Sequence, residues 1–176
     1  MKFLEDDVIR LRAVEPRDAE ILWEVETDSN QWRDNGMMAP YSRHNLEEYA
    51  KNYDADPIRS GQIRLIIERK EDKKIVGITD LYDISALGRT AFLAVYVLRD
   101  ERRQGLARRA ITQMEKYAHV LLNLRVLCAK VSAENQMSQQ MFPSMGYEKC
   151  GELPEWLYNA GHAASLLLFA KKLGKN

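Results

Sequence analysis

Hydrophobic and polar residues change period several times along the chain, and each change predicts a different element. Alternating apolar and basic residues from Ile9 to Val14 predict a first strand. Residues 15–28 carry an apolar stripe at helical spacing after a proline and an aspartate that favour a first helical turn. Ser42 is a residue type that caps helices, and it precedes a second short helix through residues 46–53.

Beyond residue 61 the pattern becomes that of strands. Residues 63–70 and 75–84 predict a hairpin with a charged turn, and residues 90–98 predict a third strand after the turn at Gly88. The rest predicts, in order, a helix at 106–121, a strand at 124–131, a helix at about 135–145, and strands at 147–153 and 165–173. This order predicts an α/β fold with a mixed sheet and helices on both faces, in which 90–131 is a right-handed parallel crossover.

The composition suits one globular domain, and we expect residues 1–176 to form it. Of the 176 residues, 45% are hydrophobic and 30% charged, which excludes general disorder. No apolar run approaches the roughly 18–20 residues of a membrane helix, so we expect no membrane partner. The N-terminal segment is acidic and unlike a signal peptide, and neither Cys128 nor Cys150 has metal or redox spacing. We therefore expect a reduced, cytoplasmic protein, and because the histidines are scattered we expect no metal site.

The net charge of zero hides an uneven distribution. Residues 1–56 contain 7 basic and 14 acidic residues, whereas the remainder contains 19 basic and 12 acidic ones. A zero sum argues against a nucleic-acid binder that works by bulk basicity. The two halves are either ordinary solvated faces or the sites of two partners of opposite charge. In the second case, binding of the cationic partner would weaken as salt rises.

The segment from Val95 to Ala107 is the most informative part of the chain. It leads from an apolar strand through a polar turn into a helix, whose N-terminal N–H groups can bind an anion. Gly105 and Ala107 would let a phosphate approach the backbone, and the arginines of this segment add positive charge. Solvated arginines at an ordinary helix start are the alternative. Neither GxxxxGK[ST] nor GxGxxG is present, which disfavours a nucleoside triphosphatase or a Rossmann dehydrogenase.

The run Arg102-x-x-Gly105-x-Ala107 resembles the acetyl-CoA motif Q/R-x-x-G-x-G/A of the GNAT N-acetyltransferase superfamily. Downstream, Asn135-x-x-Ser138 and the later Met-Gly-Tyr at 145–147 resemble the family's N-x-x-S-x-x-x-[YF]-x-x-x-G-[FY] segment. The resemblance spans about residues 8–172 and is nearest to ribosomal-protein alanine and spermidine or diamine acetyltransferases. It implies a single GNAT-like domain with a mixed, mostly antiparallel sheet of about seven strands.

The resemblance also implies acetyl-CoA as the co-substrate and a place for each part of it. In this family the fourth strand splays from the fifth, often by a bulge, and leaves backbone groups free. The residues implied in cofactor binding are Val95, Tyr96 and Val97 for the pantetheine arm, Arg102, Arg103, Gln104, Gly105, Leu106, Ala107 and Arg108 for the pyrophosphate, and Asn135, Ser138 and Phe142 for the outer arm and the sulfur end. Asn135 is also a residue type that caps helices, and the two roles can coexist.

Two positions depart from the family's catalytic pattern. Phe142 stands where family members commonly have a tyrosine that protonates the leaving thiolate. Phe92 stands where they often have a glutamate in the fourth strand. Asp80 is the first candidate for a replacement base, and Tyr82 alternates onto the same face of its strand. Further candidates are Tyr96, Glu26, Glu155 and Tyr158.

The implied function is an acetyl-CoA-dependent N-acetyltransferase that acts by direct attack of an amine. The acceptor would be a primary amine of a small, polyamine-like molecule or a protein N-terminus, in a pocket shaped by Trp32 and the loop 36–40. The alternative is a coenzyme A-binding module with weak or no catalysis, because Phe142 and Phe92 can neither donate nor accept a proton. A nucleic-acid binder would need a motif that this sequence lacks, so we expect no nucleic-acid partner. The resemblance further implies a homo-oligomer.

Overall fold

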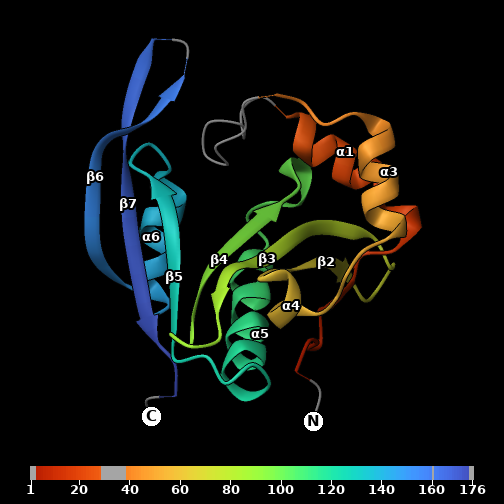
Figure 1. Cartoon of the computed structure of the whole chain (residues 1–176), viewed down its shortest axis with the longest axis horizontal. Helices are drawn as coiled ribbons and strands as arrows, with labels where there is room; N and C mark the ends of the chain where they lie inside the picture. The colour runs from red at the N-terminus through yellow and green to blue at the C-terminus, as the bar shows by residue number, and fades with distance from the viewer. Residues whose placement is uncertain (1–2, 29–38, 160, 175–176) are drawn as a thin grey trace.

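A single seven-stranded sheet organises the chain, as a computed structural model shows for residues 3–28, 39–159 and 161–174. The strand order is β1-β2-β3-β4-β5-β7-β6 (Figure 1). The strands are β1 (Ile9–Ala13), β2 (Ile63–Arg69), β3 (Ile75–Ser85), β4 (Thr90–Val97), β5 (Val126–Ser132), β6 (Glu148–Asn159) and β7 (His162–Lys172). Only β4 and β5 pair in parallel, which confirms the mixed, mostly antiparallel sheet.

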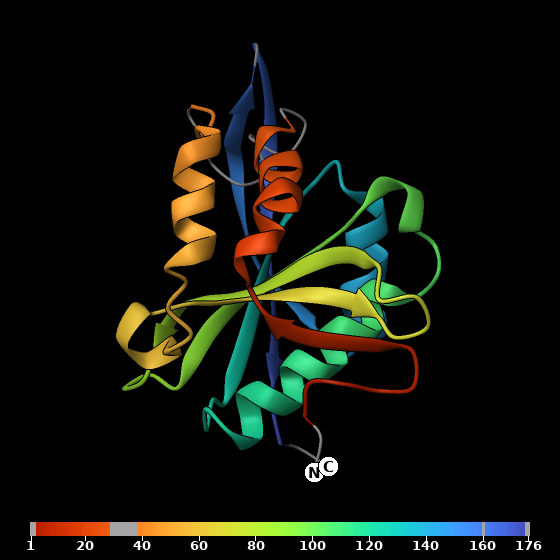
Figure 2. The same ribbon diagram turned by 90° about the vertical axis from the view of Figure 1, so that its right-hand side faces the viewer.

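Helices cover both faces of the sheet, as predicted (Figure 2). They are η1 (Pro16–Asp18), α1 (Ala19–Thr27), α3 (Arg43–Lys51), α4 (Pro57–Ser60), η2 (Arg99–Glu101), α5 (Leu106–Val120) and α6 (Gln136–Ser144). Residues of α1 and α3 pack with Ile66 and Ile78 on one face. Residues of α5 and α6 pack on the other face, where the main core lies.

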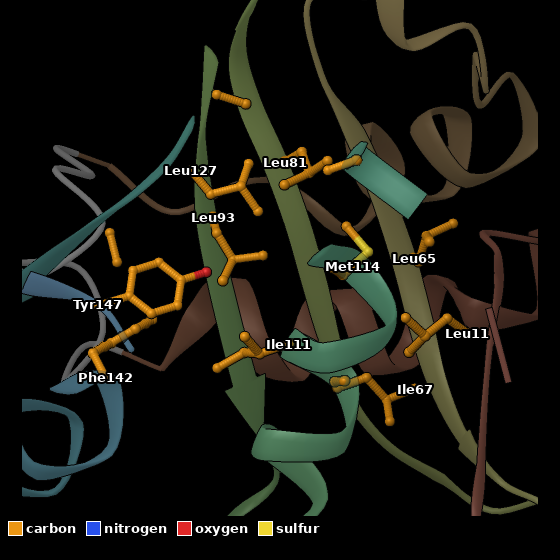
Figure 3. Packing of buried hydrophobic residues seen from close by; sticks show 14 of the residues in the cluster. Leu11, Leu65, Ile67, Leu81, Leu93, Ile111, Met114, Leu127, Phe142 and Tyr147 are labelled. Atoms are coloured by element: carbon orange, nitrogen blue, oxygen red, sulfur yellow. The ribbon is translucent and has the colours of Figure 1, made fainter. Parts of the chain in front are cut away.

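Strand alternation builds the main core. Leu11, Leu65 and Ile67 from β1 and β2 lie on the same face as Ile111 and Met114 of α5 (Figure 3). Because successive side chains of a strand point to opposite faces, Ile66 lies between Leu65 and Ile67 in sequence but packs on the other face. Both faces of β2 are therefore buried, and this explains its nearly continuous apolar run.

Capping residues set the helix boundaries more sharply than periodicity did. The Ser42 side chain accepts a hydrogen bond from the Asn45 N–H at 3.0 Å, which confirms the predicted cap, and α3 begins at Arg43. Asp56 accepts from two N–H groups and starts α4, a single turn that periodicity does not predict. Pro143 lies in the last turn of α6, which ends one residue later.

The closing hairpin is longer than predicted. β6 and β7 extend to Asn159 and His162, although the apolar pattern ended β6 at residue 153. Pairing is interrupted between Leu153 and Leu157, where Glu155 has a φ of 52°. Pairing resumes at Leu157 opposite Ala164, both of them buried. This irregularity broke the alternation from which a strand is predicted.

The split between β4 and β5 creates the space for a site. Parallel pairing joins Thr90–Phe92 to Val126–Cys128 and then stops. Beyond this point the two strands diverge (Figure 1). β4 stays paired with β3 to its end, and β5 stays paired with β7. The open side of β4 therefore faces the gap.

Within the described residues, no helix has the length and hydropathy to cross a membrane. In the same residues no three histidine, cysteine or acidic side chains gather as a metal site would require, and Cys128 and Cys150 are free thiols. The cytoplasmic location stays a prediction.

Candidate active site

The backbone of β4 offers hydrogen-bonding groups to the split. The Leu98 N–H donates to the Val76 carbonyl at 2.9 Å, so Leu98 faces β3. Because bonding alternates along an antiparallel strand, the backbone groups of Val97 and Val95 face away from β3 and into the split. The same alternation turns the backbone of Tyr96 toward β3, and it is the Tyr96 side chain that reaches a cavity. Val95 and Val97 therefore offer backbone groups to the split, whereas Tyr96 offers its side chain to the cavity.

A continuous register, rather than a bulge in β4, accompanies the split. From Phe92 to Val97 each residue of β4 pairs in order with β3. The irregularity lies instead in β3, between Tyr82 and Ser85, where Asp83 has a φ of 50°. Gly77 permits the close approach of the two strands, because a Cβ there would lie 2.1 Å from the Tyr96 carbonyl oxygen.

The start of α5 has the geometry of an anion site. Gly105 is its N-cap residue with a φ of 75°, and Arg103 also has a positive φ of 65°. A Cβ on Gly105 would meet no atom within 4 Å, so the backbone faces open space. The N–H groups of the first turn are aimed at this space and carry the positive end of the helix dipole. The Leu106 side chain is buried in the core, which leaves its backbone as the part available here.

The arginines around this turn are not equivalent. Arg102 donates from Nε to the Val97 carbonyl at 3.0 Å and lies over the Tyr96 ring. Arg108 donates to the Ser144 hydroxyl on α6. Arg109 forms ion pairs with Asp6 and Asp7, so its charge is largely neutralised. The sequence did not reveal this neutralisation.

Glu101 connects the turn before α5 to the β2–β3 turn through hydrogen bonds. Its side chain is buried and accepts from Arg69 at 2.7 Å and from Lys74 at 2.5 Å, both at the β2–β3 turn. These hydrogen bonds lower the pKa of Glu101. Gln104 adds a longer hydrogen bond of 3.3 Å to the same carboxylate. An acidic residue beside an anion site is therefore neutralised and used to hold the backbone in place.

Asn135 caps α6 on the other side of the split. Its Oδ1 accepts from the backbone N–H of Ser138 at 3.0 Å. Both residues are at the N-terminal end of the helix, and Asn135 lies three residues beyond the end of β5. The predicted capping role of Asn135 is confirmed. Its role in cofactor binding stays a prediction.

A cavity of about 720 Å³ lies on the face of the sheet that α1 and α3 cover. Its walls come from α1, α3, β2, β3, β4, β5 and the β6–β7 hairpin. Its polar and aromatic lining includes Glu26, Tyr49, Arg64, Asp80, Tyr82, Tyr96, Lys130 and Trp156. Trp156 is 65% exposed and comes from the irregular part of β6.

An ion-paired triad forms one end of the cavity. Arg64 donates from Nε and Nη2 to the two oxygens of Asp80, at 2.8 and 3.1 Å, and from Nη1 to Glu26 at 2.6 Å. These two carboxylates raise the pKa of Arg64 against the effect of its burial. Asp80, the first candidate for a base, therefore has both oxygens engaged by a guanidinium. The triad carries one net negative charge.

Lys130 occupies the end of the cavity nearest the split. It is exposed, lies two residues beyond Cys128 on β5, and its Nζ is 4.3 Å from the Phe92 ring centroid and 5.4 Å from that of Tyr82. The two rings are stacked with centroids 5.5 Å apart. Burial raises the pKa of Tyr82 to about 12. Lys130 is two residues from Cys128 and therefore lies on the same face of β5. This period of two is the signal in the sequence that could have indicated its position.

Phe142 is a core residue on the opposite face. It is 4% exposed and packs edge-on against Tyr147, with centroids 5.0 Å apart, and against Phe169 (Figure 3). Burial raises the pKa of Tyr147. Among the remaining candidates, Glu26 and Tyr96 line the cavity, whereas Glu155 and Tyr158 are exposed on β6 and are not among its lining residues. Trp32 and loop positions 36–38 lie outside the described residues.

Comparison with known proteins places this geometry in a family. The family model described as an acetyltransferase (GNAT) domain matches residues 9–148. The uncharacterized N-acetyltransferase YoaA of Bacillus subtilis is 25% identical over 158 residues, which cover 90% of this chain and 89% of that protein.

A second relative is an enzyme of Vibrio cholerae. Its spermidine N(1)-acetyltransferase is 22% identical over 156 residues, covering 87% of this chain and 86% of the enzyme. The structure of spermidine N-acetyltransferase from that organism with CoA and spermine superposes with a TM-score of 0.82 at 22% identity, over 95% of this chain and 96% of the other. A further structure of that enzyme, described as dodecameric, has a TM-score of 0.77 at 22% identity and covers 95% of each chain.

Proposed function

This chain belongs to the GNAT acetyltransferase family, and from that premise we propose that its acceptor is the primary amine of a small, polyamine-like molecule. As a member of the family it is an acetyl-CoA-dependent N-acetyltransferase. The observation that carries the proposal is the cavity that joins the β4–β5 split and ends in a triad with one net negative charge. Such an end attracts an ammonium group.

We assign the phosphates of acetyl-CoA to the turn before α5. The backbone at Gly105 faces open space at a helix N-terminus, where a pyrophosphate would accept from the first N–H groups. Arg103 has no side-chain contact among the described residues that would compete for its guanidinium. Arg102 and Arg108 would exchange their present hydrogen bonds for contacts with the phosphates.

The pantetheine arm would lie in the split, with the thioester beside Val95. The N–H of Val95 faces the split and can donate to the carbonyl oxygen as negative charge develops on it. Asn135 and Ser138 would flank the outer part of the arm. Phe142 supplies no proton, so the thiolate leaves unaided; a thiol pKa of about 8.5 makes this departure tolerable at neutral pH.

The acceptor would enter from the side of α1 and α3. Aromatic side chains around the cavity add cation–π attraction for ammonium groups. The names of the Vibrio cholerae relatives support a polyamine. A protein N-terminus remains the second acceptor to be tested, and a binding module without catalysis remains the alternative function. The dodecameric neighbour supports a homo-oligomer.

Calorimetric titration with acetyl-CoA tests cofactor binding first. We expect Arg103→Gln to weaken binding about tenfold or more, since a charge-assisted hydrogen bond contributes about 1.5–3 kcal/mol. Arg125→Gln removes the same charge from an exposed position at the start of β5 and should leave binding unchanged. Absence of binding by the native chain at millimolar acetyl-CoA would refute the proposal.

Thiol release measured over a panel of amines then separates the functions. The panel contains spermidine, a diaminoalkane, lysine methyl ester and alanine amide. Turnover with the first two and little with alanine amide supports a polyamine-like acceptor. Turnover with alanine amide alone favours a protein N-terminus, and cofactor binding without turnover favours the module.

A further inference from the structure

The reaction requires a neutral amine, because only the unprotonated nitrogen has a lone pair to attack the thioester. Ordinary alkyl amines are mostly protonated at neutral pH, as lysine side chains are. Phe92 stands where the family often has a glutamate, so that position provides no base. The carboxylates of Asp80 and Glu26 are both held by Arg64. The means of obtaining a neutral amine must therefore lie elsewhere in the cavity.

Lys130 lies at the junction between the split and the cavity. Its backbone is two residues beyond the last β4–β5 pair, Phe92 with Cys128, so it stands where the strands have begun to separate. Its side chain lines the same cavity as Ala94 and Val95 of β4. An acceptor nitrogen that reaches a thioester beside Val95 would therefore share this cavity with the Lys130 ammonium group.

The aromatic rings beneath Lys130 hold it in place without neutralising it. Phe92 and Tyr82 attract the cation through their π faces but carry no charge. Tyr82 stays uncharged up to alkaline pH, because burial raises its pKa to about 12. None of the described carboxylates forms an ion pair with Lys130. Within the described residues, Lys130 is thus a cation without an ion-pair partner at the end of the cavity where the thioester would lie.

We propose that Lys130 is a catalytic residue whose fixed positive charge keeps the acceptor nitrogen neutral at the thioester. This inference rests on the proposed N-acetyltransferase function. A cation close to a bound amine disfavours the ammonium form, and each unit by which the amine pKa falls raises the reactive fraction tenfold near neutral pH. The amine proton leaves to solvent before attack, and Lys130 takes no part in the proton transfer.

The transfer step is balanced without a protein base. The nitrogen lone pair forms the C–N bond while the carbonyl π electrons move to oxygen beside the Val95 N–H. When the carbonyl re-forms, the C–S bond breaks and sulfur leaves with the bonding pair. The second proton of the former amine is lost from nitrogen, and coenzyme A is released as the thiol once sulfur takes a proton from solvent.

The two ends of the cavity therefore have opposite charges. The Arg64 triad carries one net negative charge, and Lys130 carries one positive charge. A polyamine matches this polarity, because a distal ammonium group can bind at the triad while the reacting nitrogen beside Lys130 loses its proton. The other titratable or charged residues that line this cavity are Glu26, Tyr41, Tyr49, Arg64, Asp80, Tyr82 and Tyr96. Cys128 lies two residues before Lys130 on β5 and pairs with Phe92.

The pH dependence of single-turnover acetyl transfer tests the proposal. Native protein and Lys130→Met are compared from pH 6 to pH 10, both saturated with acetyl-CoA and with the most reactive amine of the panel. We expect the variant to be about tenfold slower at pH 7 and its pH profile to move up by about one unit, with the native rate recovered at high pH. Lys130→Arg, which keeps the charge, should retain the native profile.

Control variants separate this role from a structural one. Lys116→Met removes a lysine charge from the exposed side of α5 and should leave the profile unchanged. Lys130→Gln serves if the methionine variant melts early. A rate lowered equally at every pH or an unchanged rate at pH 7 would overturn the proposal. If native protein binds acetyl-CoA but acetylates no amine, the proposed function itself fails.

Discussion

Single side chains decide which groups of the site are available for chemistry. Asp80 and Lys130 illustrate the point, since the sequence suggested the first and passed over the second. The carboxylate of Asp80 is held at both oxygens by Arg64, which lies 16 residues away in sequence. Lys130 is held only by uncharged rings. Whether a charged side chain is free to act on a substrate therefore depends on the partners that the fold places beside it.

Asp80→Asn tests whether this carboxylate acts as a base. Because Arg64 already engages both of its oxygens, we expect the variant to raise KM for the amine and to lower kcat by less than about tenfold, with an unchanged pH profile. Loss of a general base would cost about 10²–10⁴-fold. Steady-state kinetics over pH distinguishes the two results. Asp83→Asn, three residues further along β3 and exposed, is the control because asparagine tolerates its φ of 50°.

Phe142→Ala separates the structural role of this residue from a chemical one. The ring is 4% exposed and contacts Tyr147 and Phe169, so its removal leaves a cavity in the core. We expect the free energy of unfolding to fall by about 3–5 kcal/mol. Urea denaturation measures it, and Met137→Ala on the exposed side of α6 should change little. A stability equal to that of the native chain would contradict the packing described here.

At the scale of elements, the split between β4 and β5 is the feature that makes a site. Strand β4 keeps its pairing with β3 while β5 follows β7, and each pair is stabilised on its own side of the gap. Glu101 links the β2–β3 turn to the start of α5, so the proposed phosphate site is held in place relative to β4. The site is therefore held by ordinary sheet pairing and one buried ion cluster.

Gly77→Ala tests the close approach of β3 and β4. An added Cβ would lie 2.1 Å from the Tyr96 carbonyl oxygen, and backbone atoms there cannot move aside cheaply. We expect a loss of at least about 1–3 kcal/mol of stability, with weaker acetyl-CoA binding as β4 shifts. Thermal denaturation and calorimetry measure the two effects. Gly151→Ala, where the nearest atom is a leucine side-chain carbon at 3.4 Å, is the matched control and should be tolerated.

Across the whole molecule, the uneven charge distribution has a structural explanation. Several acidic residues of the first 56 form ion pairs, among them Asp18 with Arg12 and Asp6 with Arg109. Of the acidic residues in this part, Glu26 is the one that lines the cavity within the described structure. Among the described residues, the acidic half thus supplies α1 and α3 to the walls of the cavity but one carboxylate to its lining. That acetylation of cationic acceptors slows as salt rises stays a prediction. The net negative charge of the Arg64 triad is the most direct physical reason to expect it.

Buried tyrosines should set the alkaline limit of stability. Burial raises the pKa of Tyr82 to about 12 and raises that of Tyr53, whose hydroxyl is bonded to the backbone of Arg64. Above the ordinary tyrosine pKa of 10.0 the unfolded chain loses protons that the folded chain keeps, so stability falls as pH rises from about 10 to 12. Thermal denaturation across this range, with tyrosinate absorbance, measures it. Constant stability up to pH 12 would contradict the described burial.

Local features of the fold were predictable from the sequence for physical reasons. Alternation located β1 to β5, since a buried face imposes a period of two, and the Ser42 cap and the Gly105 turn depend on neighbouring residues only. The long β6 escaped prediction because its irregularity at Glu155 interrupts that period. The Lys130 site and the Glu101 anchor escaped it as well, because their partners lie on other strands.

By itself the sequence determined the order of the elements, the glycine turn before α5 and the resemblance to one acetyltransferase family. Each of these depends on residues close together along the chain, where conformational preference and periodicity act directly. The tertiary structure alone decided which charges are neutralised. Arg64 meets Glu26 across 38 residues, whereas Lys130 meets no described carboxylate. Electrostatic interaction depends on distance in space and on burial, and only the folded sheet sets these for residues so far apart in the chain.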